Sequence, residues 1–138
     1  MPRWLLDASV ALAGEDPEDP NHLAAVALLE GSDASATLDL VLYEVANVAV
    51  TAWSDPGAAR RLVAQVEAFT LDGGVVRCEQ LLLSRAIEVA TDHGISIYDA
   101  AYVAAAEKLE ARLVSCDVRD LVSRGLAVTP RVATGHES

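Results

Sequence analysis

Aromatic residues and cysteines are scarce in this sequence. Aromatics make up 4% of its 138 residues, and Cys78 and Cys116 are the two cysteines. The two thiols lie far apart, form no C-x-x-C pair and have no histidine close by, so the sequence predicts neither a zinc site nor a disulfide scaffold. Hydrophobic residues still form 52% of the chain, which is enough for one domain with a sizeable core built from Ala, Val and Leu.

Basic residues are outnumbered by acidic ones. Ten Lys and Arg residues stand against twenty-one Asp and Glu residues, which gives a net charge of -11 at pH 7. Because non-specific binding of nucleic acid depends on neutralising phosphates with basic side chains, this balance excludes a protein that binds nucleic acid over a broad surface. Any contact with a nucleic acid must therefore rest on a local site.

Long apolar runs are also lacking. The first apolar run ends at Asp7, and the longest later stretch, Leu38–Trp53, contains Asp39, Glu44 and Asn47. A secretory signal or a membrane-spanning helix requires a longer uninterrupted apolar stretch than either of these. We therefore expect a cytoplasmic protein that does not cross a membrane.

Short apolar segments suited to strands alternate along the chain with segments suited to helices. We expect strands at residues 3–6, 35–38, 75–78, 113–116 and 126–128, and helices at 20–30, 41–53, 56–71, 79–92, 96–111 and 119–123. This alternation predicts an α/β fold of three layers, in which a mostly parallel central sheet of four to five strands is flanked by helices. We assign residues 1–132 to this single domain and expect residues 133–138 to form a flexible tail.

Four acidic residues occupy unusual positions in this pattern. Asp7 follows the first strand and Asp117 follows the fourth, so both are expected at the carboxyl edge of the sheet, where ligands bind in such folds. Glu44 borders the apolar face of its helix and needs a partner there. Asn47, one turn further on, is predicted to orient the Glu44 carboxylate by a hydrogen bond. The fourth acid, Asp99, lies in an alanine-rich helix that can approach the sheet closely.

Three of these acids also have a purely structural explanation. Asp7 and Asp117 can cap the segments that follow them, and Asp99 completes a capping box with Ser96. Glu44 lies in mid-helix and caps nothing. Carboxylates that converge at one sheet edge raise one another's pKa values, and a bound divalent cation offsets this repulsion. Since oxygen ligands favour Mg²⁺ or Mn²⁺ over zinc, the four acids together predict a site for one of these ions.

The segments that carry the four acids resemble those of a known family. "LLDAS", "YEVANV", "YDAAYVAAAEKL" and "LVSCD" occur in this order along nearly the whole chain, and together they are similar to the PIN-domain ribonucleases, above all the VapC toxins of bacterial toxin-antitoxin pairs. The resemblance implies a PIN-like fold. It also implies that Asp7, Glu44, Asp99 and Asp117 are the catalytic and metal-binding residues, supported by the hydroxyls of Ser9 and Ser115.

The same resemblance implies a function and partners. The chain is expected to be a metal-dependent endoribonuclease that hydrolyses RNA phosphodiester bonds as a toxin, with a VapB-like antitoxin as its partner and a homodimer as its assembly. Asp120 resembles an additional acid of some relatives, but the sequence favours a position on the exposed face of the last helix. A catalytically silent PIN-like module that binds metal or accepts phosphate stays open as an alternative.

Overall fold

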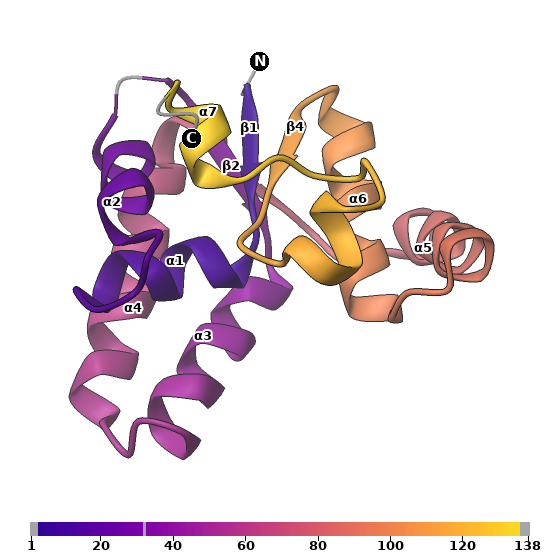
Figure 1. Cartoon of the computed structure of the whole chain (residues 1–138). Coiled ribbons are helices and arrows are strands. Elements are labelled where there is room, and N and C mark those ends of the chain that lie inside the picture. The colour runs from indigo at the N-terminus through magenta and orange to yellow at the C-terminus, as the bar shows by residue number, and fades with distance from the viewer. Residues whose placement is uncertain (1–2, 32, 136–138) are drawn as a thin grey trace.

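A four-stranded sheet forms the centre of the molecule. The computed structural model describes residues 3–31 and 33–135, and Figure 1 shows its helices around the central strands. The strands are β1 (Trp4–Leu6), β2 (Ser35–Leu38), β3 (Val75–Val76) and β4 (Arg112–Val114). They pair in the order β3-β2-β1-β4, and every pairing is parallel. The predicted fifth strand is reduced to a single parallel bridge between Val114 and Val128.

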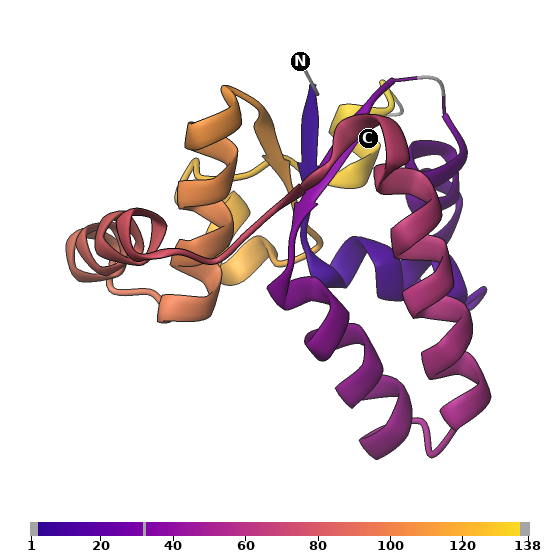
Figure 2. The same cartoon turned by 180° about the vertical axis from the view of Figure 1, so that it is seen from behind.

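Helices cover both faces of this sheet. They are α1 (Ala8–Glu15), α2 (His22–Glu30), α3 (Leu40–Thr51), α4 (Pro56–Gly73), α5 (Gln80–His93), α6 (Ile97–Leu109), the π-helix η1 (Val118–Val122) and α7 (Pro130–Ala133). Helix α2 packs with Trp4 and Leu6 against one face, whereas α4, α5 and α6 belong to the core cluster of Leu5 on the other face. Figures 1 and 2 show these helices around the strands from two opposite directions. The predicted α/β fold with a parallel sheet between helices is therefore confirmed.

The core is divided by the sheet because side chains alternate along a strand. Leu5 packs into a large cluster with residues of α3, α4, α5 and α6. Its neighbours Trp4 and Leu6 pack into a second cluster with residues of α1 and α2. Two apolar clusters on the two faces of the sheet thus make three layers, and alanine is the commonest residue of the larger cluster, as the composition predicts.

Three capping residues begin or end helices where the sequence predicts them. The Asp55 carboxylate accepts a hydrogen bond from the Ala58 N–H at the start of α4. The Ser96 hydroxyl accepts one from the Asp99 N–H at the start of α6. Gly94 ends α5 with a φ of +66°, the left-handed conformation that glycine adopts without strain. Gly94 and Ser96 together define where α5 ends and where α6, the helix that carries Asp99, begins.

Two helices of the structure were not predicted from the sequence. Helix α1 directly follows Asp7 although no helix was predicted there, because Ala8, Val10, Ala11 and Ala13 are buried around it and it shows no apolar stripe. Helix α7 forms at Pro130–Ala133 with Thr129 as its cap, and its last residue, Ala133, lies in the segment that was expected to be a flexible tail. Residues 136–138 of the predicted tail lie outside the described residues.

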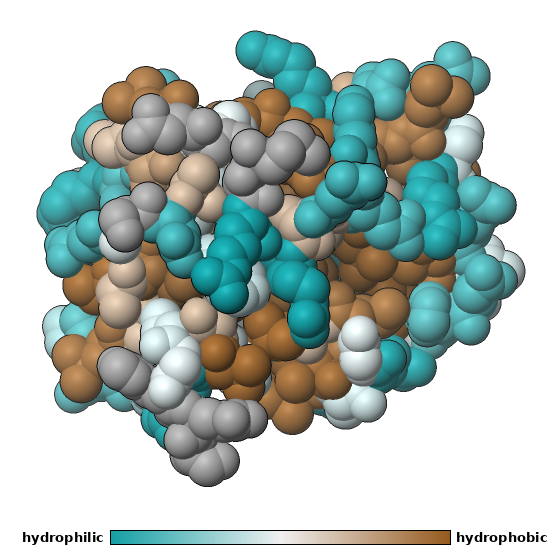
Figure 3. Space-filling view, turned by 90° about the horizontal axis from the view of Figure 1, so that it is seen from above, coloured by the Kyte–Doolittle hydropathy of each residue, from teal (hydrophilic) through white to brown (hydrophobic). Residues whose placement is uncertain are grey.

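The two ends of the sheet differ in character. Figure 3 views the end at which the strands begin, where hydrophilic and hydrophobic residues are interspersed over the surface. The opposite end, where the strands finish, carries the acidic residues described below. Within the described part of the chain, no helix combines the length and the hydropathy that a membrane span requires.

Candidate active site

Asp7 lies at the carboxyl end of β1, as its position in the sequence predicts. Its side chain is 6% exposed and caps α1 by accepting hydrogen bonds from the backbone N–H of Ser9, at 3.0 Å, and from the Ser9 hydroxyl. Burial raises the pKa of Asp7 to about 6, although the hydrogen bonds from Ser9 favour the ionised form. The capping role and a place at the carboxyl edge of the sheet are therefore combined in one residue.

Two hydroxyls join the ends of β1 and β4. The Ser9 hydroxyl accepts a hydrogen bond from the Cys116 N–H at 2.8 Å, and its oxygen lies 3.4 Å from that of Ser115. Ser115 is fully buried and accepts a hydrogen bond from the Asp117 N–H at 3.0 Å. Since these contacts connect the residue that follows β1 to the loop that follows β4, they hold Asp7 and Asp117 in fixed positions relative to each other.

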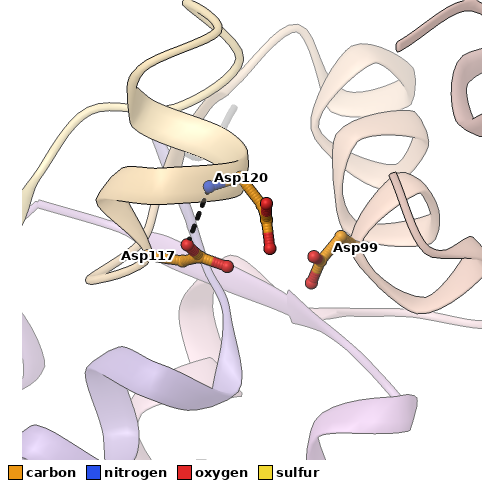
Figure 4. Close-up of side chains that lie close together, drawn as sticks. All are labelled: Asp99, Asp117 and Asp120. Carbon is orange, nitrogen blue, oxygen red and sulfur yellow. Dashed lines mark hydrogen bonds between the residues drawn. The ribbon is translucent and has the colours of Figure 1, made fainter. Parts of the chain in front are cut away.

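Asp99, Asp117 and Asp120 bring their carboxylates together beside this loop. One carboxylate oxygen from each lies within 4.8 Å of those of the other two, and all three residues are half-buried. Figure 4 shows Asp99 extending from α6 toward Asp117 and Asp120 at the start of η1. The pKa of Asp99 is raised by burial and then by the charges of Asp117 and Asp120. Like charges so close together favour a bound cation.

Glu44 approaches this cluster from α3. Its pKa is raised by burial and by the charge of Asp99, while a hydrogen bond from the Tyr102 hydroxyl, at 2.5 Å, opposes that shift. Asn47, the predicted partner of Glu44, is exposed, and its side chain makes none of the hydrogen bonds found among the described residues. The structure thus gives Glu44 a partner from another helix in place of its neighbour on α3.

Asp120 and Tyr102 are two residues of the site that were not predicted from the sequence to belong to it. Asp120 was expected on the exposed face of the last helix, but the Asp117 carboxylate accepts a hydrogen bond from its N–H at 2.9 Å, and this turn faces Asp99. Each of the two lies three residues after a recognised acid, Asp120 after Asp117 and Tyr102 after Asp99. Within α6 this spacing puts Tyr102 on the same side as Asp99 and was the available signal, whereas Asp120 lies in a π-helical turn that was not predicted.

The sequence matches one family model over nearly all of its length. That model describes the PIN domain, and the match covers residues 4–123. The chain belongs to the PIN-domain family. All five acids described above, Asp7, Glu44, Asp99, Asp117 and Asp120, fall inside the matched segment.

Three relatives of this PIN domain locate it more closely. It is 35% identical over 137 residues to ribonuclease VapC3 of Pyrobaculum aerophilum, covering 93% of this chain and 99% of that protein. The crystal structure of the P. aerophilum protein PAE2754 is 25% identical with a TM-score of 0.73, covering 98% of this chain and 88% of the other. A toxin-antitoxin complex from Klebsiella pneumoniae contains a chain with the same fold, 16% identical with a TM-score of 0.68, covering 91% and 96%. The PIN domain described here is therefore of the VapC type.

The cluster of Asp99, Asp117 and Asp120 is typical of the metal site of PIN domains. Its donors are carboxylate oxygens, which suit hard divalent cations such as Mg²⁺ and Mn²⁺. The half-burial of all three residues leaves part of each side chain accessible, so that an ion and a substrate phosphate can both approach. The residues present therefore fit a divalent ion.

Replacing Ser115 with alanine is expected to lower the free energy of unfolding by about 1–3 kcal/mol. The Asp117 N–H would lose its acceptor in a region where Ser115 is fully buried, and leaving such a donor without a partner carries that penalty. Urea denaturation of the wild-type and variant PIN domains measures the difference. Ser84→Ala, on the exposed side of α5, is the control, and equal stability of the two variants would contradict the structural role of Ser115.

Proposed function

We propose that this PIN domain is a metal-dependent endoribonuclease that hydrolyses RNA phosphodiester bonds and acts as the toxin of a toxin-antitoxin pair. The observation that carries the proposal is the convergence of carboxylates from α3, α6 and η1 beside the buried Asp7 in a VapC-type chain. A site with this charge repels phosphate unless a cation is present, so metal dependence is part of the proposal.

We propose that the role of each acidic residue depends on its position in the site. Asp99, Asp117 and Asp120 offer the oxygens that would hold Mg²⁺ or Mn²⁺. Glu44, beside Asp99, is proposed to bind the same ion directly or through water. Asp7 is proposed to complete the negative environment, since the hydroxyls of Ser9 and Ser115 connect it to Asp117. A bound divalent ion supplies the positive charge that activates water and stabilises the phosphoryl group during hydrolysis.

The proposed protein partner is a small VapB-like antitoxin. The chain of the same fold from K. pneumoniae is part of a toxin-antitoxin complex, which supports a partner of this kind. Apolar side chains are exposed on α3 and α4, among them Val50 and Leu71. Contact with a partner would remove this apolar surface from water, and we propose that the antitoxin binds there. A homodimer is proposed as the assembly on which the antitoxin binds.

The proposal is tested by incubating the purified protein with a mixed RNA pool in Mn²⁺, in Mg²⁺ and in EDTA. We expect cleavage with either ion, no cleavage in EDTA, and products that carry 5′-phosphates. An absence of cleavage under all three conditions, with a protein that binds Mn²⁺, would favour the silent metal-binding module instead.

Mn²⁺ is expected to raise the melting temperature of the protein by several degrees. A ligand that binds only the folded state stabilises it by about 2.7 kcal/mol when its concentration is about 100 times its dissociation constant. The effect is measured by thermal denaturation across a manganese titration. Asp99→Asn should abolish the increase and the exposed control Asp92→Asn should retain it, whereas a melting temperature independent of Mn²⁺ would contradict the metal site.

A further inference from the structure

Among the hydrogen bonds of the described residues, the one made by the Tyr102 side chain joins the two helices that carry Glu44 and Asp99. Tyr102 lies on α6 three residues after Asp99, so both side chains leave the same side of that helix. Its hydroxyl donates a hydrogen bond to Glu44 Oε1 on α3 at 2.5 Å. We propose that Tyr102 is a positioning residue of the active site, which holds the Glu44 carboxylate in the orientation needed for metal binding and RNA hydrolysis.

The ring of Tyr102 is held firmly enough for this role. It is 2% exposed and belongs to the larger core cluster, together with Val45 of α3 and Ala101 of α6. A side chain packed in this way has already lost its rotational freedom on folding, so its hydroxyl holds a partner without a further loss of entropy. Supporting residues that fix a ligand in this manner strengthen metal sites.

The contact also determines which part of Glu44 is available. Among the hydrogen bonds of the described residues, the one from Tyr102 is the only one that the Glu44 carboxylate accepts, and it occupies Oε1. Oε2 is left to a ligand, while the charge of Asp99 acts on Glu44 from the cluster. Without the phenol, Glu44 is a flexible side chain on a helix surface, and its carboxylate would be spread over several rotamers.

A core tyrosine whose hydroxyl merely needs a partner would show the same contact, so the test must separate the two roles. The inference rests on the proposed function, and therefore one readout is Mn²⁺ affinity without RNA and the other is RNA cleavage. Tyr102→Phe removes the hydroxyl and keeps the packed ring. Tyr43→Phe is the matched control, because Tyr43 lies next to Glu44 on α3 and is 82% exposed.

The experiment uses five proteins: the wild type, Tyr102→Phe, the control Tyr43→Phe, Glu44→Gln and the double variant of Tyr102→Phe with Glu44→Gln. Mn²⁺ dissociation constants are measured from free Mn²⁺ by electron paramagnetic resonance, and kcat and KM are measured on RNA. We expect Tyr102→Phe to weaken Mn²⁺ binding about tenfold and to lower kcat about tenfold, while KM stays within twofold of the wild-type value. A tenfold effect is expected because it corresponds to the free energy that a hydrogen bond to a charged group typically contributes. In the Glu44→Gln background, the same substitution is expected to change neither quantity.

Three results would overturn the inference. The first is that Tyr102→Phe and Tyr43→Phe have the same Mn²⁺ affinity and the same kcat. The second is that Tyr102→Phe lowers both quantities as much in the Glu44→Gln background as in the wild type. The third is that Tyr102→Phe lowers the thermal stability in EDTA as much as it lowers kcat. If the wild type binds Mn²⁺ but cuts no RNA, the proposed function fails, and the Mn²⁺ affinities of the five proteins still decide the role of Tyr102.

Discussion

Replacing Asp99 with asparagine is expected to lower the rate of RNA cleavage by about 100-fold or more while leaving the fold intact. The Asp99 carboxylate belongs to the cluster with Asp117 and Asp120, and its charge also contributes to the raised pKa of Glu44 on α3. Removing it takes one anionic oxygen from the proposed ligand set, and electrostatic groups of this importance typically contribute such factors to kcat. The measurement is the initial rate of cleavage at saturating Mn²⁺.

The fold is expected to survive because helix α6 does not depend on the Asp99 carboxylate for its start. The Ser96 hydroxyl caps α6 by accepting from the Asp99 backbone N–H, which asparagine also possesses. In EDTA, the variant is expected to melt at a higher temperature than the wild type, since one of three mutually repelling charges is gone. Asp92→Asn on the exposed side of α5 removes a charge elsewhere and should cut RNA at the wild-type rate. Cleavage by the Asp99 variant at that same rate would show that the cluster is not the catalytic centre.

The fold was predictable because its determinants are local. The Asp55, Ser96 and Gly94 caps are signals within a few residues of the helix ends that they define. The strands are short apolar segments between such signals, and their parallel order follows from the intervening helices. Helix α1 was not predicted because it packs between the sheet and α2 and has apolar residues on most of its sides. Its sequence therefore lacks the alternation of polar and apolar faces by which a helix is recognised.

The sequence predicted most of the acidic residues of the site, but it did not predict which side chains they contact. Asp7 and Asp117 follow from strand ends, and the acidic residue Glu44 is conspicuous beside an apolar stripe. The partner of Glu44 depends on how α3 and α6 cross, which sequence spacing within α3 does not contain, and so Asn47 was predicted in place of Tyr102. Likewise, the orientation of Asp120 depends on the π-helical turn after Asp117, which differs from an α-helix in the face it presents.

Replacing Asp7 with asparagine is expected to stabilise the metal-free protein by about 3 kcal/mol above pH 6. Burial raises the pKa of Asp7 from 3.8 to about 6, so the folded state holds the proton more strongly than the unfolded state does. Stability from this group is therefore complete below about pH 4 and is lost as the pH rises through 6. The difference of about two pKa units corresponds to about 3 kcal/mol at 1.36 kcal/mol per unit. Urea denaturation in EDTA from pH 4 to pH 8 measures it.

The difference between the two proteins should be small at pH 4, grow up to pH 6 and then stay constant. Asparagine keeps an oxygen that can accept from the Ser9 N–H, so the cap on α1 is retained, and Asp92→Asn serves again as the exposed control. A stability difference that is the same at pH 4 and pH 7 would contradict the burial of a charged Asp7. Because a carboxylate at this position weakens the fold, its presence needs a reason outside stability, and the proposed active site supplies one. We accordingly expect Asp7→Asn to be more stable than the wild type and to have lost the ability to cut RNA.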